Sequence, residues 1–148
     1  MIRIIDIVLS SLGLVIFSPL ICIVYICIYI ENRSPLFYQE RLGCKMKVFL
    51  LVIFRTMTKG TGNIATHLVD PASISRIGNL LRKTKIDELP QLWNVLIGEM
   101  SIVGPRPCLA SQKELIKARL RFNIYNFKPG ITGLAQINGV DMSNPFLL

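Results

Sequence analysis

The apolar positions are concentrated at the start of the chain. From Ile7 to Ile30, a run of 24 residues, no side chain is charged. As a single helix at about 1.5 Å per residue, this run would be roughly 36 Å long, which exceeds a bilayer core of about 30 Å. It is too long for a secretory signal peptide, and no small-x-small cleavage pattern closes it. The pattern therefore predicts a membrane anchor.

Ser18-Pro19 interrupts the run near its centre. A proline inside a helix removes one backbone hydrogen bond and clashes with the preceding turn, at a cost of about 3 kcal/mol or more. The interruption predicts two helical pieces, Ile7–Phe17 and Leu20–Ile30, each of about 16 Å, or roughly half the hydrocarbon thickness. Such pieces suit a re-entrant hairpin, with the Ser18 hydroxyl bonding a carbonyl that the proline frees. A kinked helix that spans the membrane is the alternative. Basic residues lie on both flanks of the run, so the positive-inside rule does not decide between the hairpin and the spanning helix.

After Glu31, short apolar runs alternate with polar turns. Pro35–Gln39 and Val48–Phe54 have the pattern of extended segments or apolar helix pieces. Helices are predicted where apolar residues recur on one face, at Ile74, Ile77, Leu80 and Leu81, and again at Leu89, Leu92, Trp93 and Leu96 before a stop at Gly98. A capping box at Ser111–Glu114 predicts a third helix, to about Arg121.

Gly60–Asn63 and Lys128–Gly130 are expected to form a loop and a turn. The elements together predict an α+β, mainly helical fold. Its parts are a membrane segment over residues 1–32 and a small polar domain over residues 33–148.

The charge of the chain is strongly basic, with 17 Lys and Arg against 9 Asp and Glu and a net charge of +8. Only Arg3 and Asp6 precede the apolar run, so the excess lies in the polar remainder. Such a surface suits anionic headgroups or phosphorylated substrates. Nucleic acid is not expected as a partner, because the basic residues are dispersed. One histidine, His67, and four cysteines without a C-x-x-C pair give little support to a zinc site or a Ser-His-Asp triad.

Two acids lie side by side in KIDELPQLWN, residues 85–94. Pro90 is tolerated only in the first turn of a helix, so this helix must begin close to Asp87. The helix N-terminus would favour the anionic form of Asp87, which a carboxylate nucleophile requires. Adjacent carboxylates point about 100° apart on a helix, so Glu88 can hold a hard cation or handle a proton instead. A solvated helix start is the alternative.

Basic residues accompany these acids. Arg82 and Lys85 could hold substrate phosphates that would otherwise repel the carboxylates. Pro105-Arg106-Pro107 fixes an arginine between two prolines, so its guanidinium could take two phosphate oxygens at low entropic cost. A proline-rich turn with a surface arginine is the alternative for this second motif.

In combination, these residues resemble the bacterial sugar transferases, the monotopic polyprenyl-phosphate phosphoglycosyl transferases. The resemblance extends to about Asn138-Gly139, and its motifs are specific only together. They occur in the family's order: Phe17-Ser18-Pro19, Gln39-Glu40-Arg41, Phe54-Arg55-Thr56-Met57, Asp87-Glu88-Leu89-Pro90-Gln91-Leu92-Trp93-Asn94, Gly104-Pro105-Arg106-Pro107 and Pro129-Gly130-Ile131-Thr132-Gly133.

The resemblance implies a two-step reaction with Mg²⁺ held at Asp87 and Glu88. The Asp87 carboxylate attacks the β-phosphate of a UDP-sugar, releasing UMP and leaving a phosphosugar on the aspartate. Undecaprenyl phosphate then attacks this intermediate to give an undecaprenyl-diphosphate sugar. Glu88 assists at the metal or deprotonates the second nucleophile. Arg82 and Arg106 match phosphate-binding positions, and Arg55 is a third candidate.

The resemblance also implies a location. Family members use the Ser18-Pro19 break to form a re-entrant helix, so residues 33–148 would be a cytoplasmic catalytic domain on the bacterial inner membrane, in contact with its lipids. Family members usually continue for several tens of residues, so a fragment or a truncated product is expected here. A truncated, catalytically inactive homologue and a basic membrane-anchored binding module are the competing hypotheses. The candidate donors are UDP-N-acetylated amino sugars, UDP-galactose and UDP-glucose.

Overall fold

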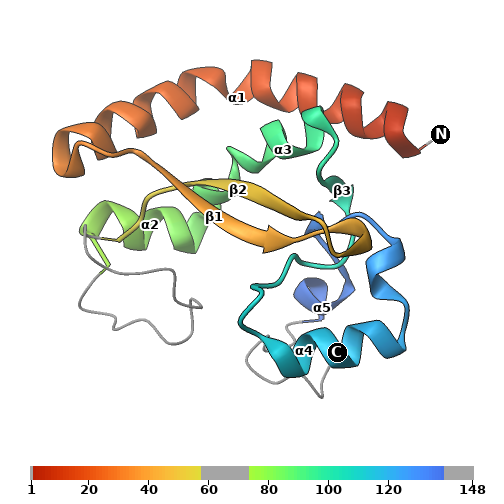
Figure 1. The fold of residues 1–148 in the computed structure, drawn as a ribbon. Coiled ribbons are helices and arrows are strands. Elements are labelled where there is room, and N and C mark those ends of the chain that lie inside the picture. Colours follow the sequence, from red (N-terminus) through yellow and green to blue (C-terminus); the bar gives the residue numbers. More distant parts are fainter. Residues whose placement is uncertain (1, 58–73, 139–148) are drawn as a thin grey trace.

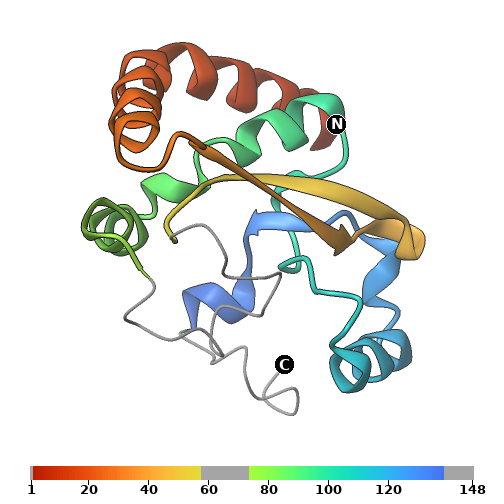
Figure 2. The ribbon, with the colours of Figure 1, turned by 60° about the vertical axis from the view of Figure 1, so that its left-hand side comes forward.

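A computed structural model describes residues 2–57 and 74–138. The loop expected at Gly60–Asn63 and the histidine His67 lie outside these residues. The elements, in chain order, are α1 (Ile2–Asn32), β1 (Leu36–Leu42), the 3₁₀ turn η1 (Cys44–Met46), β2 (Val48–Phe54), α2 (Arg76–Thr84), the 3₁₀ turn η4 (Ile86–Glu88), α3 (Gln91–Ile97), β3 (Ser101–Val103), α4 (Lys113–Arg121), η5 (Ile124–Asn126), β4 (Gly130–Thr132) and α5 (Leu134–Ile137). The fold is thus helical with a small sheet region, as predicted in outline. In Figures 1 and 2 the β1–β2 hairpin crosses between α1 and α3 on one side and α4 and α5 on the other.

The N-terminal helix α1 is continuous through Pro19, so the prediction of two separate pieces is wrong. Pro19 lacks the N–H that would bond the Val15 carbonyl, and the Ser18 hydroxyl donates to that carbonyl at 2.8 Å instead. The predicted role of Ser18 is therefore confirmed, and it lets the helix pass the proline without a loop. Both views show the orange C-terminal part of α1 running in a different direction from its red N-terminal part (Figures 1 and 2), a bend of the kind that proline causes.

The first half of α1 turns a polar stripe toward the rest of the molecule. Arg3 donates to the Val95 and Leu96 carbonyls at the end of α3, at 2.5 and 2.7 Å. The buried Asp6 carboxylate accepts hydrogen bonds from the Ser101 hydroxyl at 2.9 Å and from the Ile102 amide at 3.0 Å. We call the contacts of Arg3 and Asp6 with α3 and β3 the polar seam.

The opposite surface of α1 is apolar and exposed over most of the helix. Fifteen large apolar side chains from Ile2 to Ile30 are exposed. By length and composition, α1 is the helix within the described ranges that could cross a membrane. A surface of this kind is stable only against lipid or another apolar partner.

The first sheet is an antiparallel hairpin, with Leu36 opposite Phe54 and Leu42 opposite Val48. These residues are therefore strands, and the alternative of apolar helix pieces is excluded. The free edge of β2 is bonded by Asn94 of α3, which donates to the Leu50 carbonyl at 2.7 Å and accepts from the Val52 amide at 3.1 Å. The Asn94 side chain thus pairs with β2 as a neighbouring strand would.

The second sheet pairs β3 with β4 in parallel, with Ser101 opposite Gly130. Glycines allow the close approach of the two segments. A Cβ atom on Gly130 would lie 2.1 Å from the Gly104 nitrogen, and one on Gly133 would lie 2.3 Å from the Gly104 oxygen. These contacts explain why both the Gly-Pro-Arg-Pro and the Pro-Gly-Ile-Thr-Gly motifs need glycine.

The buried faces of the predicted helices differ in part from expectation. In α2, Leu81 is buried, but Leu80 is 62% exposed and Ile74 precedes the helix, which is capped by Ser75. In α3, Gln91, Asn94 and Val95 are the buried residues, while Trp93 is 52% exposed. Leu92, on the predicted apolar face, lies against Gly13 of α1, whereas the Asn94 side chain turns toward β2.

The third helix, α4, reaches Arg121 as predicted, but it begins at Lys113 without a capping box. Gln112 occupies the N-cap position and makes no side-chain cap hydrogen bond. The Gln112 side chain instead accepts from the Leu109 amide at 3.0 Å. The helix thus begins one residue later than an N-cap at Ser111 would require. The predicted stop of α3 at Gly98 is confirmed by its left-handed backbone, with a φ of 94°.

Removal of the Asp6 carboxylate tests the polar seam. We expect Asp6→Ala to lower the free energy of unfolding by about 2 kcal/mol or more, because the Ser101 hydroxyl and the Ile102 amide lose their acceptor. Thermal unfolding in detergent micelles measures this loss. Glu31→Gln is the control, since it removes an exposed carboxylate from the same helix. Equal melting temperatures for the two variants would contradict the role of the seam.

Candidate active site

Asp87 and Glu88 lie in the 3₁₀ turn η4, immediately before α3. Helix α2 ends at Lys85, whose left-handed backbone (φ 60°) reverses the chain into η4. Leu89 and Pro90 then have helical dihedral angles before α3 proper begins at Gln91. The two carboxylates therefore precede the helix in a separate turn, slightly further from its N-terminus than expected from Pro90.

The Asp87 carboxyl group is partly buried, and its Oδ1 atom has no hydrogen-bond partner among the described residues. Burial raises its pKa to about 6, and the neighbouring Glu88 charge adds to this, while Lys85 and Arg82 lower it. We expected the helix N-terminus to favour the anion. Loss of hydration and the Glu88 charge outweigh that effect, so Asp87 holds its proton more tightly than an ordinary aspartate.

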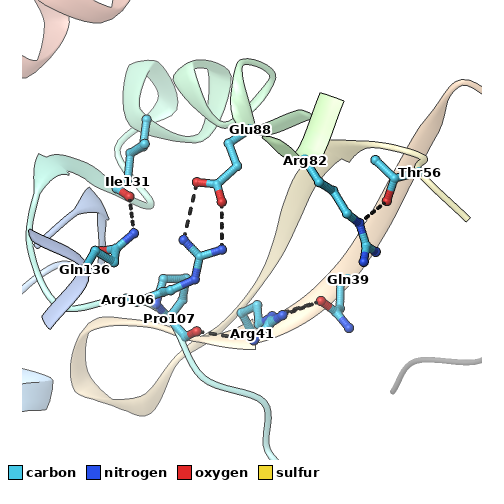
Figure 3. A network of polar contacts seen from close by, with 9 residues as sticks. All are labelled: Gln39, Arg41, Thr56, Arg82, Glu88, Arg106, Pro107, Ile131 and Gln136. Atoms are coloured by element: carbon cyan, nitrogen blue, oxygen red, sulfur yellow. Dashed lines mark hydrogen bonds and ion pairs between the residues drawn. The ribbon is translucent and has the colours of Figure 1, made fainter. Parts of the chain in front are cut away.

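Glu88 forms a two-point ion pair with Arg106. Arg106 Nη2 donates to Glu88 Oε1 at 2.8 Å, and Nη1 donates to Oε2 at 3.3 Å. Figure 3 shows the two side chains facing each other from η4 and from the loop after β3. The Arg106 guanidinium, predicted to hold phosphate, thus lies at the carboxylate pair, and Glu88 rather than Asp87 is its partner.

The backbone of the Pro105–Pro107 segment is held by two further arginines. Arg119 of α4 donates to the Arg106 carbonyl at 2.7 Å, and Arg41 of β1 donates to the Pro107 carbonyl at 3.3 Å. Arg41 also donates twice to the Gln39 side-chain oxygen. Sequence reasoning assigned no role to Arg41. The signal that was available is the strand period, since Gln39 and Arg41, two residues apart, lie on one face of β1.

Arg82 lies beside Asp87, close enough for each charge to affect the pKa of the other. Its Nε donates to the Thr56 hydroxyl at 2.8 Å (Figure 3), and Thr56 is buried. Thr56 is thus a second residue to which the sequence analysis gave no role, although it belongs to the Phe54-Arg55-Thr56-Met57 motif. The other arginine of that motif, Arg55, donates to the Ser34 and Leu36 carbonyls at 3.1 and 3.5 Å, and its phosphate-binding role stays a prediction.

The acids of the site are suited to a weakly held hard cation. No cluster of three or more His, Cys, Asp or Glu side chains that could bind a metal occurs in the ranges 2–57 and 74–138. Mg²⁺ often uses only one or two carboxylates and takes its other ligands from water and substrate phosphates. The unpartnered Asp87 Oδ1 beside Glu88 fits this kind of donor set.

Two adjacent carboxylates, with the guanidinium of Arg82 beside Asp87 and that of Arg106 paired with Glu88, occur in a chain that begins with a long apolar helix. The family described as bacterial sugar transferase matches residues 1–146. The chain belongs to this family.

Several named relatives are similar to most of this chain. The chain is 37% identical over 142 residues to a UDP-glucose:undecaprenyl-phosphate glucose-1-phosphate transferase of Klebsiella pneumoniae, covering 93% of this chain and 30% of the relative. A Caulobacter vibrioides protein of the same name is 37% identical over 93% of this chain and 54% of its own length. A UDP-galactose-lipid carrier transferase of Erwinia amylovora is 33% identical over 82% and 29%. The chain thus spans between about a third and about half of the length of these relatives.

The titration of Asp87 tests the electrostatics of the site directly. With ¹³Cγ-labelled aspartate and no divalent cation, we expect the Asp87 signal to titrate with a midpoint near pH 6. Glu88→Gln should lower the midpoint, because it removes a neighbouring negative charge. Arg82→Gln should raise it, because a positive neighbour is lost. Asp87→Asn identifies the signal, and a wild-type midpoint near 4 would contradict the effect of burial.

Proposed function

We propose that this chain transfers a sugar 1-phosphate from a UDP-sugar to undecaprenyl phosphate, in the synthesis of polysaccharide or another glycoconjugate. One observation carries the proposal: Asp87 presents a buried carboxylate oxygen that has no hydrogen-bond partner among the described residues, beside a Glu88 that Arg106 already neutralises. Membership of the sugar transferase family and the names of the relatives give the reaction class.

In the first step, an Asp87 oxygen forms a bond to the β-phosphorus of the UDP-sugar. The bond from that phosphorus to the oxygen bridging to the α-phosphate breaks, and UMP leaves with this oxygen. Asp87 must be unprotonated to attack, and with a pKa of about 6 most of it is anionic at neutral pH. Arg82, which lies beside Asp87, and Arg106, which is paired with Glu88, would bind the diphosphate oxygens.

In the second step, a phosphate oxygen of undecaprenyl phosphate attacks the phosphorus held on Asp87. The bond between Asp87 and phosphorus breaks, which restores the carboxylate and yields the undecaprenyl-diphosphate sugar. Two attacks at one phosphorus replace one difficult transfer by two easier ones. Glu88 has two candidate roles, as a ligand of the cation or as the base for a protonated lipid phosphate.

Asp87 and Glu88 would hold Mg²⁺ together with the substrate phosphates. When bound, the cation would neutralise charge on the diphosphate. Both Glu88 oxygens already accept hydrogen bonds from Arg106. Asp87 Oδ1 has no partner among the described residues, so it is the oxygen that is available to the cation.

The exposed apolar side of α1 supports a place in the bacterial inner membrane. The polar seam faces the opposite way, so lipid and protein contacts occupy different sides of one helix. We propose the cytoplasmic face for residues 33–148, because a soluble nucleotide sugar and a lipid phosphate meet there. The bend at Pro19 supports a re-entrant course with both ends on this face.

The activity is tested by UMP release from UDP-sugars in membranes with Mg²⁺ and undecaprenyl phosphate. We propose UDP-glucose and UDP-galactose as the first donors to test, and UDP-N-acetylated amino sugars complete the panel. Asp87→Asn should abolish release, at least a thousandfold, since it removes the nucleophile. Glu114→Gln, an exposed acid of α4, should release UMP at the wild-type rate.

Two results would contradict the proposed activity. Equal release by Asp87→Asn and wild type would exclude Asp87 as the nucleophile. No release by a folded, membrane-bound wild-type chain would favour the inactive homologue or the binding module. The preferred donor of an active chain identifies the sugar.

The course of α1 is tested by labelling from one side of the membrane. In a chain freed of its native cysteines, Ile2→Cys and Arg33→Cys should react with a membrane-impermeant maleimide from the same, cytoplasmic side. Reaction from opposite sides would establish a spanning helix. Pro19→Ala, which restores a regular helix, should shift the population toward the spanning course.

A further inference from the structure

Three guanidinium groups converge on the Pro105–Pro107 segment. Arg106 extends from it to Glu88, Arg119 bonds its backbone from α4, and Arg41 bonds it from β1. In Figure 3, Arg106 lies between Glu88 and Arg41. The three side chains come from distant parts of the sequence and are brought together by the packing of β1, α4 and this loop.

The positive charge at this place exceeds the negative charge. Within the described part of the chain, Glu88 is the partner in the one salt bridge, and it is paired with Arg106. The acceptors that Arg41 and Arg119 bond in the described ranges are all neutral: the Gln39 side chain and two backbone carbonyls. A partly or fully buried guanidinium without a counter-charge is costly. Burial, and next the nearby Arg106 charge, lower the pKa of Arg41 to about 10, so it stays charged at neutral pH.

Arg41 and Arg119 differ in how far they are exposed. Arg119 is only 6% exposed and donates to the Arg106 carbonyl, so it supplies charge and holds the backbone. Arg41 is only partly buried. Its guanidinium has five N–H donors, and the Gln39 and Pro107 contacts take three, so two have no acceptor among residues 2–57 and 74–138. The two hydrogen bonds to Gln39 fix the orientation of the Arg41 guanidinium.

We propose that Arg41 and Arg106 together form an oxyanion subsite that binds a phosphate group of a substrate. The phosphate supplies the negative charge that the three guanidiniums lack. Two chemically similar groups qualify, the diphosphate of the nucleotide sugar and the phosphate of the lipid acceptor. The inference rests on the proposed function for the source of the phosphate, but binding itself requires no turnover.

Binding of inorganic phosphate to the full chain in detergent micelles tests the subsite. We expect phosphate to raise the melting temperature of the wild type above that in chloride of equal ionic strength. The apparent Kd for phosphate should rise about tenfold or more in Arg41→Gln, which loses charged hydrogen-bond donors. Arg121→Gln, which removes an exposed arginine of α4, should bind as the wild type does.

Arg41→Lys is a second variant for the case in which Arg41→Gln does not fold, because it keeps the charge. A lysine cannot bond Gln39 and Pro107 and also present a two-donor fork, so we expect a several-fold weaker affinity for phosphate. Wild-type affinity in the folded Arg41→Gln variant, or the absence of any phosphate-specific stabilisation in the wild type, would overturn the proposal.

Two probes distinguish the source of the phosphate. UMP represents the donor side and farnesyl phosphate, a short prenyl phosphate, the acceptor side. Weaker binding of UMP alone by Arg41→Gln assigns the subsite to the donor, and weaker binding of farnesyl phosphate alone assigns it to the acceptor. Unchanged affinity for both would reject the subsite. A chain that binds these probes through Arg41 but releases no UMP would keep the subsite and reject the proposed activity.

Discussion

The contacts of Arg3 and Asp6 join the apolar helix α1 to α3 and β3, and the rest of the structure depends on this junction. They attach the first half of α1 through charged groups, so the apolar side chains of that helix face outward. This arrangement is the reverse of a soluble amphipathic helix, and it is the arrangement expected where lipid replaces water. Because Asp6 binds the first two residues of β3, the same contact also sets the start of the strand that leads to Arg106. The apolar helix and the candidate site are therefore linked through the same contacts.

The two carboxylates of the site, Asp87 and Glu88, differ in their charge pairing. Glu88 is neutralised by Arg106, whereas the Asp87 Oδ1 atom is left without a partner among the described residues and its pKa is raised by burial. A carboxylate that is poorly solvated but still anionic at neutral pH is a better nucleophile than one engaged in an ion pair. The surplus of guanidiniums around it suits a substrate that brings several negative charges of its own.

Several motif residues serve the architecture on which the chemistry depends. Asn94 bonds the edge of β2 as a strand would, which fixes α3 and hence the turn that carries Asp87. Gly104, Gly130 and Gly133 permit backbone contacts that no side chain would leave room for. The Arg106 loop is thereby held from both sides, by glycine contacts and by the guanidiniums of Arg41 and Arg119.

Local patterns were sufficient for the elements and for the position of the acids, because helix periods, strand periods and turn residues act over a few neighbours. They predicted the apolar helix, the stop at Gly98 and a helix starting near Asp87. For Pro35–Gln39 and Val48–Phe54 they left open whether the segments are strands or apolar helix pieces. They did not predict the continuity of α1 through Pro19, the burial of Asn94, or the Glu88–Arg106 pair. Nor did they predict the raised pKa of Asp87 or the convergence of Arg41 and Arg119. Burial and charge pairing depend on groups tens of residues apart, so they follow from how β1, α3, α4 and the Arg106 loop pack against each other.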